Sequence, residues 1–341
     1  MPRHLAGLFA ACGLFVARAG AQAPPAEEPV EEVVVTGEFP GPGMWRVTRP
    51  GDVAGHEMWI VGDPPPLPKR MKWKAREVES VALRAQEILQ DASVRMDPDE
   101  KIGLFRGLSL LPAAMKARKN PDESLLRDQL PPELYARWLV QKKRYLGSDS
   151  GIEKWRPIFA ADKLRREAFD ELDLRESGMV WEVVGKLAKK YHIPTTTPNL
   201  HFKFHTDDLK EKIREFSREP LADTECFATT LDLTEALADS ATEARRARAW
   251  ATADLATLDS LPPLPNPYIP CAMAVMGSQV AKEIIPADLR ERLYVSWMDA
   301  AEKSLAANQT TLAIVPLTKL TRGGGYLERL RARGYTIEAP K

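Results

Sequence analysis

Two short apolar runs near opposite ends of the chain place the strongest constraint on its fold. The first, Trp59-Ile60-Val61, is followed by Gly62-Asp63 and a run of prolines. The second, Leu312-Ala313-Ile314-Val315, is followed by Pro316 and, three residues later, Lys319. A short apolar run that stops at proline is typical of a strand entering a loop. We therefore expect both runs to be strands of one small sheet built from the two ends of the chain.

Turn residues and apolar spacing divide the remainder into a hairpin and a long helical section. Met44–Thr48 and Met58–Val61 are β-prone runs separated by Pro50-Gly51-Asp52, which predicts an antiparallel hairpin. The chain ends in a strand–helix–strand, and residues 195–204 are β-prone in part. Together these elements predict an α/β fold with a small central sheet and a large helical section. The predicted helices cover residues 75–90, 102–117, 131–146, 153–174, 179–191, 207–216, 226–258, 271–283 and 286–306.

The order and spacing of these segments resemble the TraB/GumN family, which includes the Tiki-type metal-dependent proteases. The likeness runs from Gly41-Pro42-Gly43 to Tyr335-Thr336-Ile337 and includes Leu130-Pro131-Pro132 between them. The triplet Gly323-Gly324-Gly325 stands where the family has a glycine-rich loop after its second motif. The resemblance implies an erythromycin-esterase/ChaN-like α/β architecture, with residues 41–341 as one domain.

The family places a Gly-x-x-His motif at the end of each of two strands, and the resemblance identifies both motifs here as degenerate. Gly62 and Asp63 open the first motif, but Pro65 stands where its histidine would fall. In the second motif, Pro316 replaces the glycine and Lys319 replaces the histidine. A metal ion such as Zn²⁺ needs ligands with free lone pairs, which proline and protonated lysine do not offer. We expect a non-catalytic member without cofactor, retaining the fold as a binding or scaffolding module for an unknown partner.

A second hypothesis is a metal-dependent, peptidase-like hydrolase with rearranged ligands. Its ligands would come from His56, Asp63 and Asp91, holding an ion such as Mn²⁺, Co²⁺ or Zn²⁺. Glu87 is a further carboxylate in the segment where the family tends to carry a glutamate, and the sequence leaves the register between Glu87 and Asp91 open. This hypothesis requires His56 and the carboxylates to lie within about 4–5 Å of one another.

His201 and His205 do not offer a better metal site. They alternate with Phe202 and Phe204, which predicts a half-buried edge strand with the two phenylalanines inward. On a strand, histidines at this spacing are about 13 Å apart, too far to share one ion.

The first 21 residues have the pattern of a secretory signal peptide. Arg3 and His4 precede an apolar run, and Ala19-Gly20-Ala21 supplies a cleavage site. Residues 22–40 are rich in proline and glutamate, which predicts a disordered leader. No other run approaches the roughly 20 apolar residues of a membrane helix. We therefore expect a periplasmic or secreted protein that is not an integral membrane protein.

Two cysteines, Cys226 and Cys271, remain after that cleavage. An even count in an oxidising compartment favours a disulfide, and the alternative is two buried free thiols. The bond would close a loop of about 45 residues and add about 3–4 kcal/mol to stability.

Charge argues against nucleic acid as a partner. The chain has 48 basic and 48 acidic side chains, and loss of Arg3 and Arg18 with the signal would leave 46 against 48, a net charge of −2. Proteins that bind nucleic acid usually carry a clear basic excess or stripe.

Overall fold

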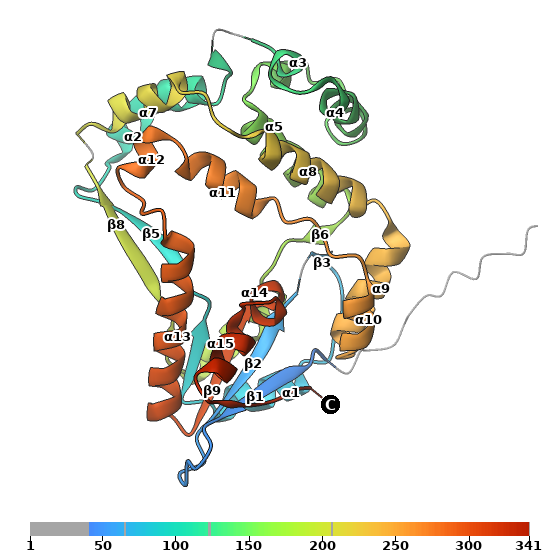
Figure 1. Cartoon of the computed structure of the whole chain (residues 1–341), viewed down its shortest axis with the longest axis vertical. Helices are drawn as coiled ribbons and strands as arrows, with labels where there is room; N and C mark the ends of the chain where they lie inside the picture. The colour runs from blue at the N-terminus through green and yellow to red at the C-terminus, as the bar shows by residue number, and fades with distance from the viewer. Residues whose placement is uncertain (1–40, 65, 122–123, 206, 341) are drawn as a thin grey trace, which may run out of the picture. The chain divides into compact units, whose positions relative to one another are not determined.

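A six-stranded mixed sheet joins the two ends of the described chain (Figure 1). The structure, a computed structural model, describes residues 41–64, 66–121, 124–205 and 207–340; the expected signal peptide and leader, and Pro65, lie outside them. The predicted central sheet built from the chain ends is confirmed. Its strands, in spatial order, are β10 (Thr336–Glu338), β1 (Met44–Thr48), β2 (Glu57–Asp63), β9 (Thr310–Pro316), β4 (Glu87–Gln90) and β7 (Thr195–Thr196).

The register of the sheet brings the two sequence runs together. β1 and β2 form the predicted antiparallel hairpin, with Met44 opposite Val61. β2 then pairs in parallel with β9, from Glu57 opposite Thr310 to Asp63 opposite Pro316. β9 pairs in parallel with β4 on its other side. The carboxyl ends of β2, β9 and β4 therefore meet at one edge of the sheet, the edge where open α/β folds bind ligands.

The segment 87–90 corrects the predicted helix over residues 75–90. The helix α1 covers only Arg76–Arg84, and the chain then enters β4 between β9 and β7. Ile88 and Leu89 are fully buried there, one on each face of the sheet. A short apolar run in a buried parallel strand lacks the alternation that marks a half-exposed strand, so its periodicity does not distinguish it from a helix.

Helices cover both faces of the sheet. On one face, Met58 and Ile60 pack with residues of α13 (Leu289–Ala307), α14 (Leu317–Thr321) and α15 (Tyr326–Ala332). On the other face, Val61 packs with residues of α1, α6 (Met179–Tyr191) and α9 (Ser240–Ala251). The alternation along β2 thus feeds two separate apolar layers, as expected for a strand in the middle of an α/β sandwich.

The remaining elements form the helical section and two small sheets. Trp138 and Phe227 lie at the centre of its main apolar cluster, with ring centroids 5.4 Å apart. No helix in the described ranges is long and apolar enough to cross a membrane. The elements are α2 (Leu104–Ala117), α3 (Leu126–Gln129), α4 (Pro132–Tyr145), η2 (Gly151–Lys154), α5 (Pro157–Glu171), α7 (Leu209–Arg218), α8 (Thr224–Ala236), α10 (Leu255–Ser260), α11 (Tyr268–Met276) and α12 (Gln279–Lys282), with β3 (Leu67–Pro68) antiparallel to β6 (Leu174–Arg175) and β5 (Ser93–Pro98) parallel to β8 (Asn199–Phe204).

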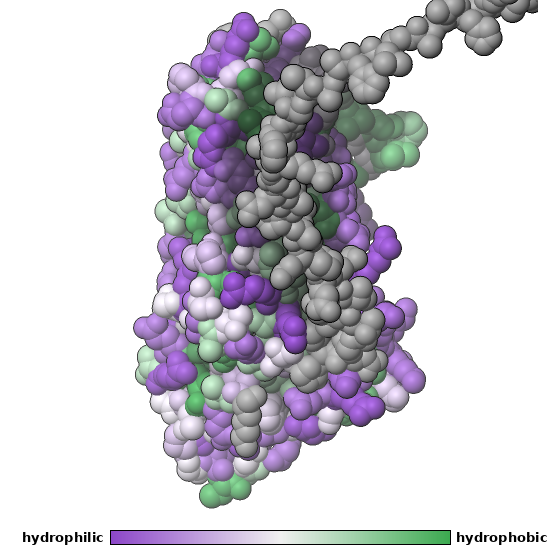
Figure 2. Space-filling view, turned by 90° about the vertical axis from the view of Figure 1, so that its right-hand side faces the viewer, coloured by the Kyte–Doolittle hydropathy of each residue, from purple (hydrophilic) through white to green (hydrophobic). Residues whose placement is uncertain are grey.

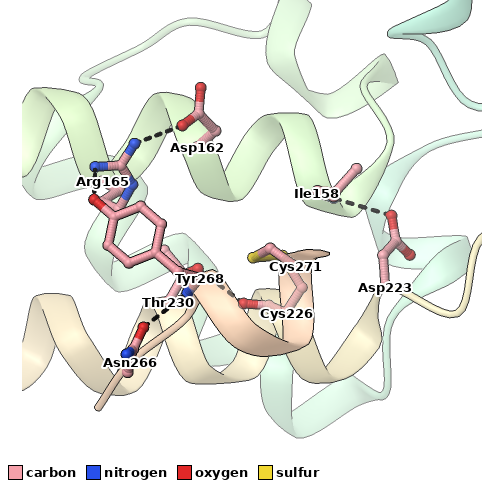
Figure 3. The surroundings of a disulfide bond; sticks show 9 residues. All are labelled: Ile158, Asp162, Arg165, Asp223, Cys226, Thr230, Asn266, Tyr268 and Cys271. Atoms are coloured by element: carbon pink, nitrogen blue, oxygen red, sulfur yellow. Dashed lines mark hydrogen bonds and ion pairs between the residues drawn. A yellow bond between two sulfur atoms is a disulfide. The ribbon is translucent and has the colours of Figure 1, made fainter. Parts of the chain in front are cut away.

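A disulfide between Cys226 and Cys271 links α8 to α11 (Figure 3). The two Cα atoms are 4.5 Å apart, and the bond lies in a small apolar cluster with Ile158 and Ala274. Ala274 is the only residue of α11 that is buried, so apolar packing alone holds this helix weakly. The disulfide is therefore the main anchor of α11 on the helical section.

We predict that the Cys226→Ala/Cys271→Ala double variant unfolds with about 2–4 kcal/mol less free energy than the wild type, because the unfolded chain regains the freedom of a loop of 45 residues. Urea denaturation with and without dithiothreitol measures the difference. Reductant should lower the midpoint of the wild type and leave that of the double variant unchanged. Equal midpoints for the two proteins under oxidising conditions would contradict the prediction.

Candidate functional site

A cleft of about 540 Å³ opens at the carboxyl edge of β2 and β9. Its floor includes Asp63 at the end of β2, Pro316 at the end of β9, and Lys319 in α14. Its walls come from α11, the start of α13, and the proline-containing connector before α11. Asp63, near one end of the chain, and Pro316 and Lys319, near the other, thus line the same cleft.

Gly62 allows the two chain ends to approach each other closely. A Cβ atom at this position would lie 2.6 Å from Leu317 Cδ1 and 3.2 Å from Leu317 Cα, so only glycine fits beneath the first residue of α14. The Gly62 carbonyl accepts a hydrogen bond from Trp250 Nε1 at 3.0 Å. Gly62 therefore has a packing role that is independent of any metal chemistry.

The Asp63 carboxylate is hydrogen-bonded to backbone amides at the start of α6. It accepts hydrogen bonds from the backbone amides of Gly178 at 2.6 Å and Val180 at 3.4 Å. Burial raises the pKa of Asp63 above the ordinary value of 3.8, although the two amides oppose that shift. This arrangement satisfies amide groups that the first turn of a helix leaves unpaired, and it turns the carboxylate away from a role as an exchangeable ligand.

Lys319 forms an ion pair with Asp91, the residue that follows β4. The Lys319 Nζ lies 2.5 Å from one carboxylate oxygen of Asp91, and the Tyr326 hydroxyl donates to the other at 2.6 Å. The side chains of Lys319 and Asp91 are 34% and 21% exposed, so the pair is only partly solvated. An ammonium and a phenol together occupy the acceptor oxygens that Asp91 could otherwise direct to a cation.

Tyr326 is fixed in this position by aromatic neighbours. Its ring lies 3.9 Å from that of Trp297 and 5.2 Å from that of Tyr294, measured between centroids. Burial raises the pKa of Tyr326, and the adjacent Asp91 carboxylate adds to that rise. The phenol therefore remains a proton donor to Asp91 over the whole physiological range.

The structure does not bring His56, Asp63 and Asp91 together. His56 precedes β2 and pairs with Asp52 at 3.1 Å in the hairpin loop, while Asp63 ends β2 about 20 Å away along the strand. Glu87 begins β4, at the edge opposite the cleft, and accepts hydrogen bonds from Ser304 and Asn308. Burial would raise the pKa of Glu87, but these and other hydrogen bonds outweigh it and lower the pKa. Asp91 is thus the acidic residue of the Glu87–Asp91 segment that lies at the ligand edge.

The donor set at the cleft does not suit a divalent metal ion. Across the described ranges, no group of three His, Cys, Asp or Glu side chains is placed to share an ion. His201 and His205 flank the half-buried Phe202 and Phe204 on β8, as expected, and each pairs with its own aspartate. At the cleft itself, Asp63 is held by backbone amides and Asp91 by a lysine. Pro65, at the first motif position, is outside the described residues.

The cleft wall formed by α11 was not predicted from the sequence. Arg165 of α5 anchors its first turn by donating to the Tyr268 hydroxyl at 3.1 Å and pairing with Glu176 (Figure 3 shows Arg165 and Tyr268). The Tyr268 hydroxyl in turn donates to Glu176 at 2.5 Å. The sequence predicted a helix over residues 271–283 but gave no sign that it borders a cleft. The lining residues come both from the connector before α11, including Leu264 and Pro267, and from α11 itself.

The fold and the cleft together define an α/β protein with a ligand cleft at the carboxyl edge of parallel strands. The family description TraB/PrgY/gumN matches residues 43–339, which is nearly the whole described chain. The chain therefore belongs to the TraB/PrgY/gumN family. No curated protein and no solved structure shows significant similarity to it.

We predict that Lys319→Met lowers the free energy of unfolding by about 1–2 kcal/mol, because it leaves a partly buried carboxylate without its charged donor. Asp91→Asn should cost a similar amount. The double variant should cost less than the sum of the two by at least about 0.5 kcal/mol, since both remove the same interaction. Urea denaturation of the four proteins completes the cycle. Lys143→Met on the exposed face of α4 is the matched control, with an expected change in the free energy of unfolding under about 0.5 kcal/mol. If the effects of the two single substitutions simply add in the double variant, Lys319 and Asp91 do not interact.

Asp63 generates a pH-dependent prediction. Because burial raises its pKa in the folded protein, the folded state holds the proton more tightly than the unfolded state does. The wild type should therefore lose stability relative to Asp63→Asn as the pH rises from 3.8 through the raised value. Denaturation midpoints of the two proteins at pH 3.5 to 7 measure this difference. If the stability of the wild type instead rises relative to that of Asp63→Asn with increasing pH, folding lowers the pKa of Asp63 and the prediction is wrong.

Proposed function

We propose that the protein is an exported, non-catalytic member of its family that uses the cleft to bind a ligand. One observation carries this proposal: the ion pair between Lys319 and Asp91 occupies the edge of the sheet where ligands of α/β folds are bound. A lysine held by a carboxylate repels a divalent cation and takes the place of the ion as the positive charge of the site. On this basis the two motifs no longer bind a metal ion, while the cleft that they border is retained for ligand binding.

The compartment is part of the same proposal. The composition of residues 1–21 supports a signal peptide, and the disulfide between Cys226 and Cys271 supports an oxidising environment such as the periplasm or the exterior of the cell. A cytosolic enzyme would gain little from this bond, because cytosolic thiols are kept reduced.

A hydrolase with rearranged ligands is the competing function. It would need a ligand set other than His56, Asp63 and Asp91, since His56 and Asp63 lie at opposite ends of β2. It would also need Lys319 to release Asp91 when the ion binds.

Calorimetric titration of the chelator-treated mature protein with Mn²⁺, Co²⁺ and Zn²⁺ tests the proposal. We expect no saturable binding with a Kd below about 1 μM, a value that corresponds to about −8.2 kcal/mol. Lys319→Ala serves as a companion variant, because it removes the repelling ammonium and leaves Asp91 free. Stoichiometric, sub-micromolar binding by the wild type, together with metal-dependent cleavage of a casein substrate, would establish the hydrolase instead.

A further inference from the structure

The walls of the cleft are apolar and open to solvent. Ile269, Met273 and Met276 of α11 face it, together with Leu289 and Leu293 of α13. Met273 is 59% exposed and Ile269 is 37% exposed, so large apolar side chains meet water in a concave site. The volume of about 540 Å³ falls in the range of small-molecule sites. Unbranched methionine side chains also adapt to ligands of variable shape.

The acidic groups of this site are already paired. Glu176 is held by Arg165 and the Tyr268 hydroxyl, and Asp63 by the amides at the start of α6. Lys319 is balanced by Asp91. None of these groups presents an uncompensated charge to the cleft.

Two arginines in the lining are left without such partners. Arg290 and Arg322 are both exposed, and within the described ranges neither makes an ion pair or a side-chain hydrogen bond. The neighbouring Glu291 is engaged by Arg329 at 2.7 Å. Arg290 lies in the first turn of α13 beside Glu291, with which it interacts electrostatically although Arg329 takes the hydrogen bonds of that carboxylate. The hydrogen-bond donors of the two exposed guanidinium groups therefore make this part of the cleft positive.

An apolar trough beside two exposed arginines is complementary to a molecule with a long apolar part and an anionic head. We infer that the cleft binds a single-chain anionic amphiphile, such as a long-chain alkyl carboxylate, with its chain along α11 and α13 and its head at Arg290 and Arg322. This inference rests on the proposed binding function and names its ligand class.

A peptide fits the same cleft less well. Its backbone would bring amide and carbonyl groups that must be paired on burial. The cleft lining includes Pro64, Pro66, Pro265, Pro267 and Pro316, and proline cannot donate a backbone hydrogen bond. An alkyl chain needs no such partners, so the apolar wall suits it better.

Calorimetry on the full mature protein, with ligands below their micellar concentrations, tests the inference. Dodecanoate should bind with a stoichiometry of one, and decanoate should bind about 15-fold more weakly, because each methylene transferred from water contributes about fourfold in affinity. Dodecyltrimethylammonium, which has the same chain and the opposite charge, should bind at least tenfold more weakly than dodecanoate.

Two sets of variants assign the parts of the ligand. Arg290→Gln/Arg322→Gln should weaken dodecanoate at least tenfold and leave dodecanol unchanged, whereas the matched pair Arg245→Gln/Arg248→Gln on α9 should alter neither. Met273→Asp, at an exposed position that folding tolerates, should weaken both ligands. Circular dichroism confirms that each variant is folded.

The outcomes separate this inference from the proposed function. Equal affinity for the two head groups, or insensitivity to both the arginine and the Met273 variants, would overturn the assignment of an anionic amphiphile. Saturable binding of apolar peptides without binding of alkyl carboxylates would also overturn it, while leaving a binding cleft in place. Sub-micromolar metal binding with hydrolysis would instead remove the proposed function.

Discussion

The parallel pairing of β2 with β9 is the constraint on which the rest of the structure depends. It aligns Asp63 with Pro316 and so places the loops from both ends of the chain at one edge of the sheet. The chain leaves β2 at that edge and must come back to the opposite edge, where β9 begins with Thr310 beside Glu57. The long segment between residues 64 and 309 makes this crossover and contains the large helical section. Such a non-local contact is entropically costly to form. Gly62 offsets part of this cost, because the absence of a side chain lets α14 pack directly on β2.

At the carboxyl edge of β2, β9 and β4, the acidic side chains are paired with groups of the same chain. Three carboxyl groups lie near this edge or its approaches, and each has a different fixed partner: amides for Asp63, a lysine and a phenol for Asp91, and an arginine for Glu176. A metal ion would pair with such groups reversibly, whereas partners that belong to the same chain are always present beside them. At Asp63 and Lys319, two of the motif positions that the family resemblance marks, the charged groups are therefore paired within the chain.

The sequence allowed the strands of the chain ends, the β1–β2 hairpin and the helix α6 to be predicted, because each has clear turn residues or a clear apolar period. It did not allow β4 to be separated from α1, since Ile88 and Leu89 continue the apolar pattern of the helix and are buried on both faces of the sheet. The same error hid the partner of Lys319. Only when residues 87–90 are a strand parallel to β9 does Asp91 arrive beside α14. An ion pair between residues at the ends of different strands, such as Lys319 and Asp91, depends on how the strands are paired. The spacing of apolar residues along one segment does not specify that pairing.

Exposed apolar side chains are not confined to the cleft, since five large ones follow α2: Leu104, Phe105, Leu108, Leu111 and Met115. On the face shown in Figure 2, hydrophilic residues predominate, and a group of hydrophobic residues projects at the upper right. Isolated apolar residues on a surface need no explanation, whereas several on one wall of a concave site do.

The helix α11 shows how such a wall can be kept in shape without being buried. Its inner side is fixed by the disulfide to α8 and by Arg165 at Tyr268, and these contacts leave Ile269 and Met273 free of packing partners that would fill the cleft. A wall anchored by one covalent bond and one charged hydrogen bond does not need to collapse onto the core to remain folded. The cost of ordering the backbone of α11 is met during folding, so a ligand that covers its side chains gains apolar burial without having to order the helix itself. The same anchors that hold the cleft open thus preorganise it for binding.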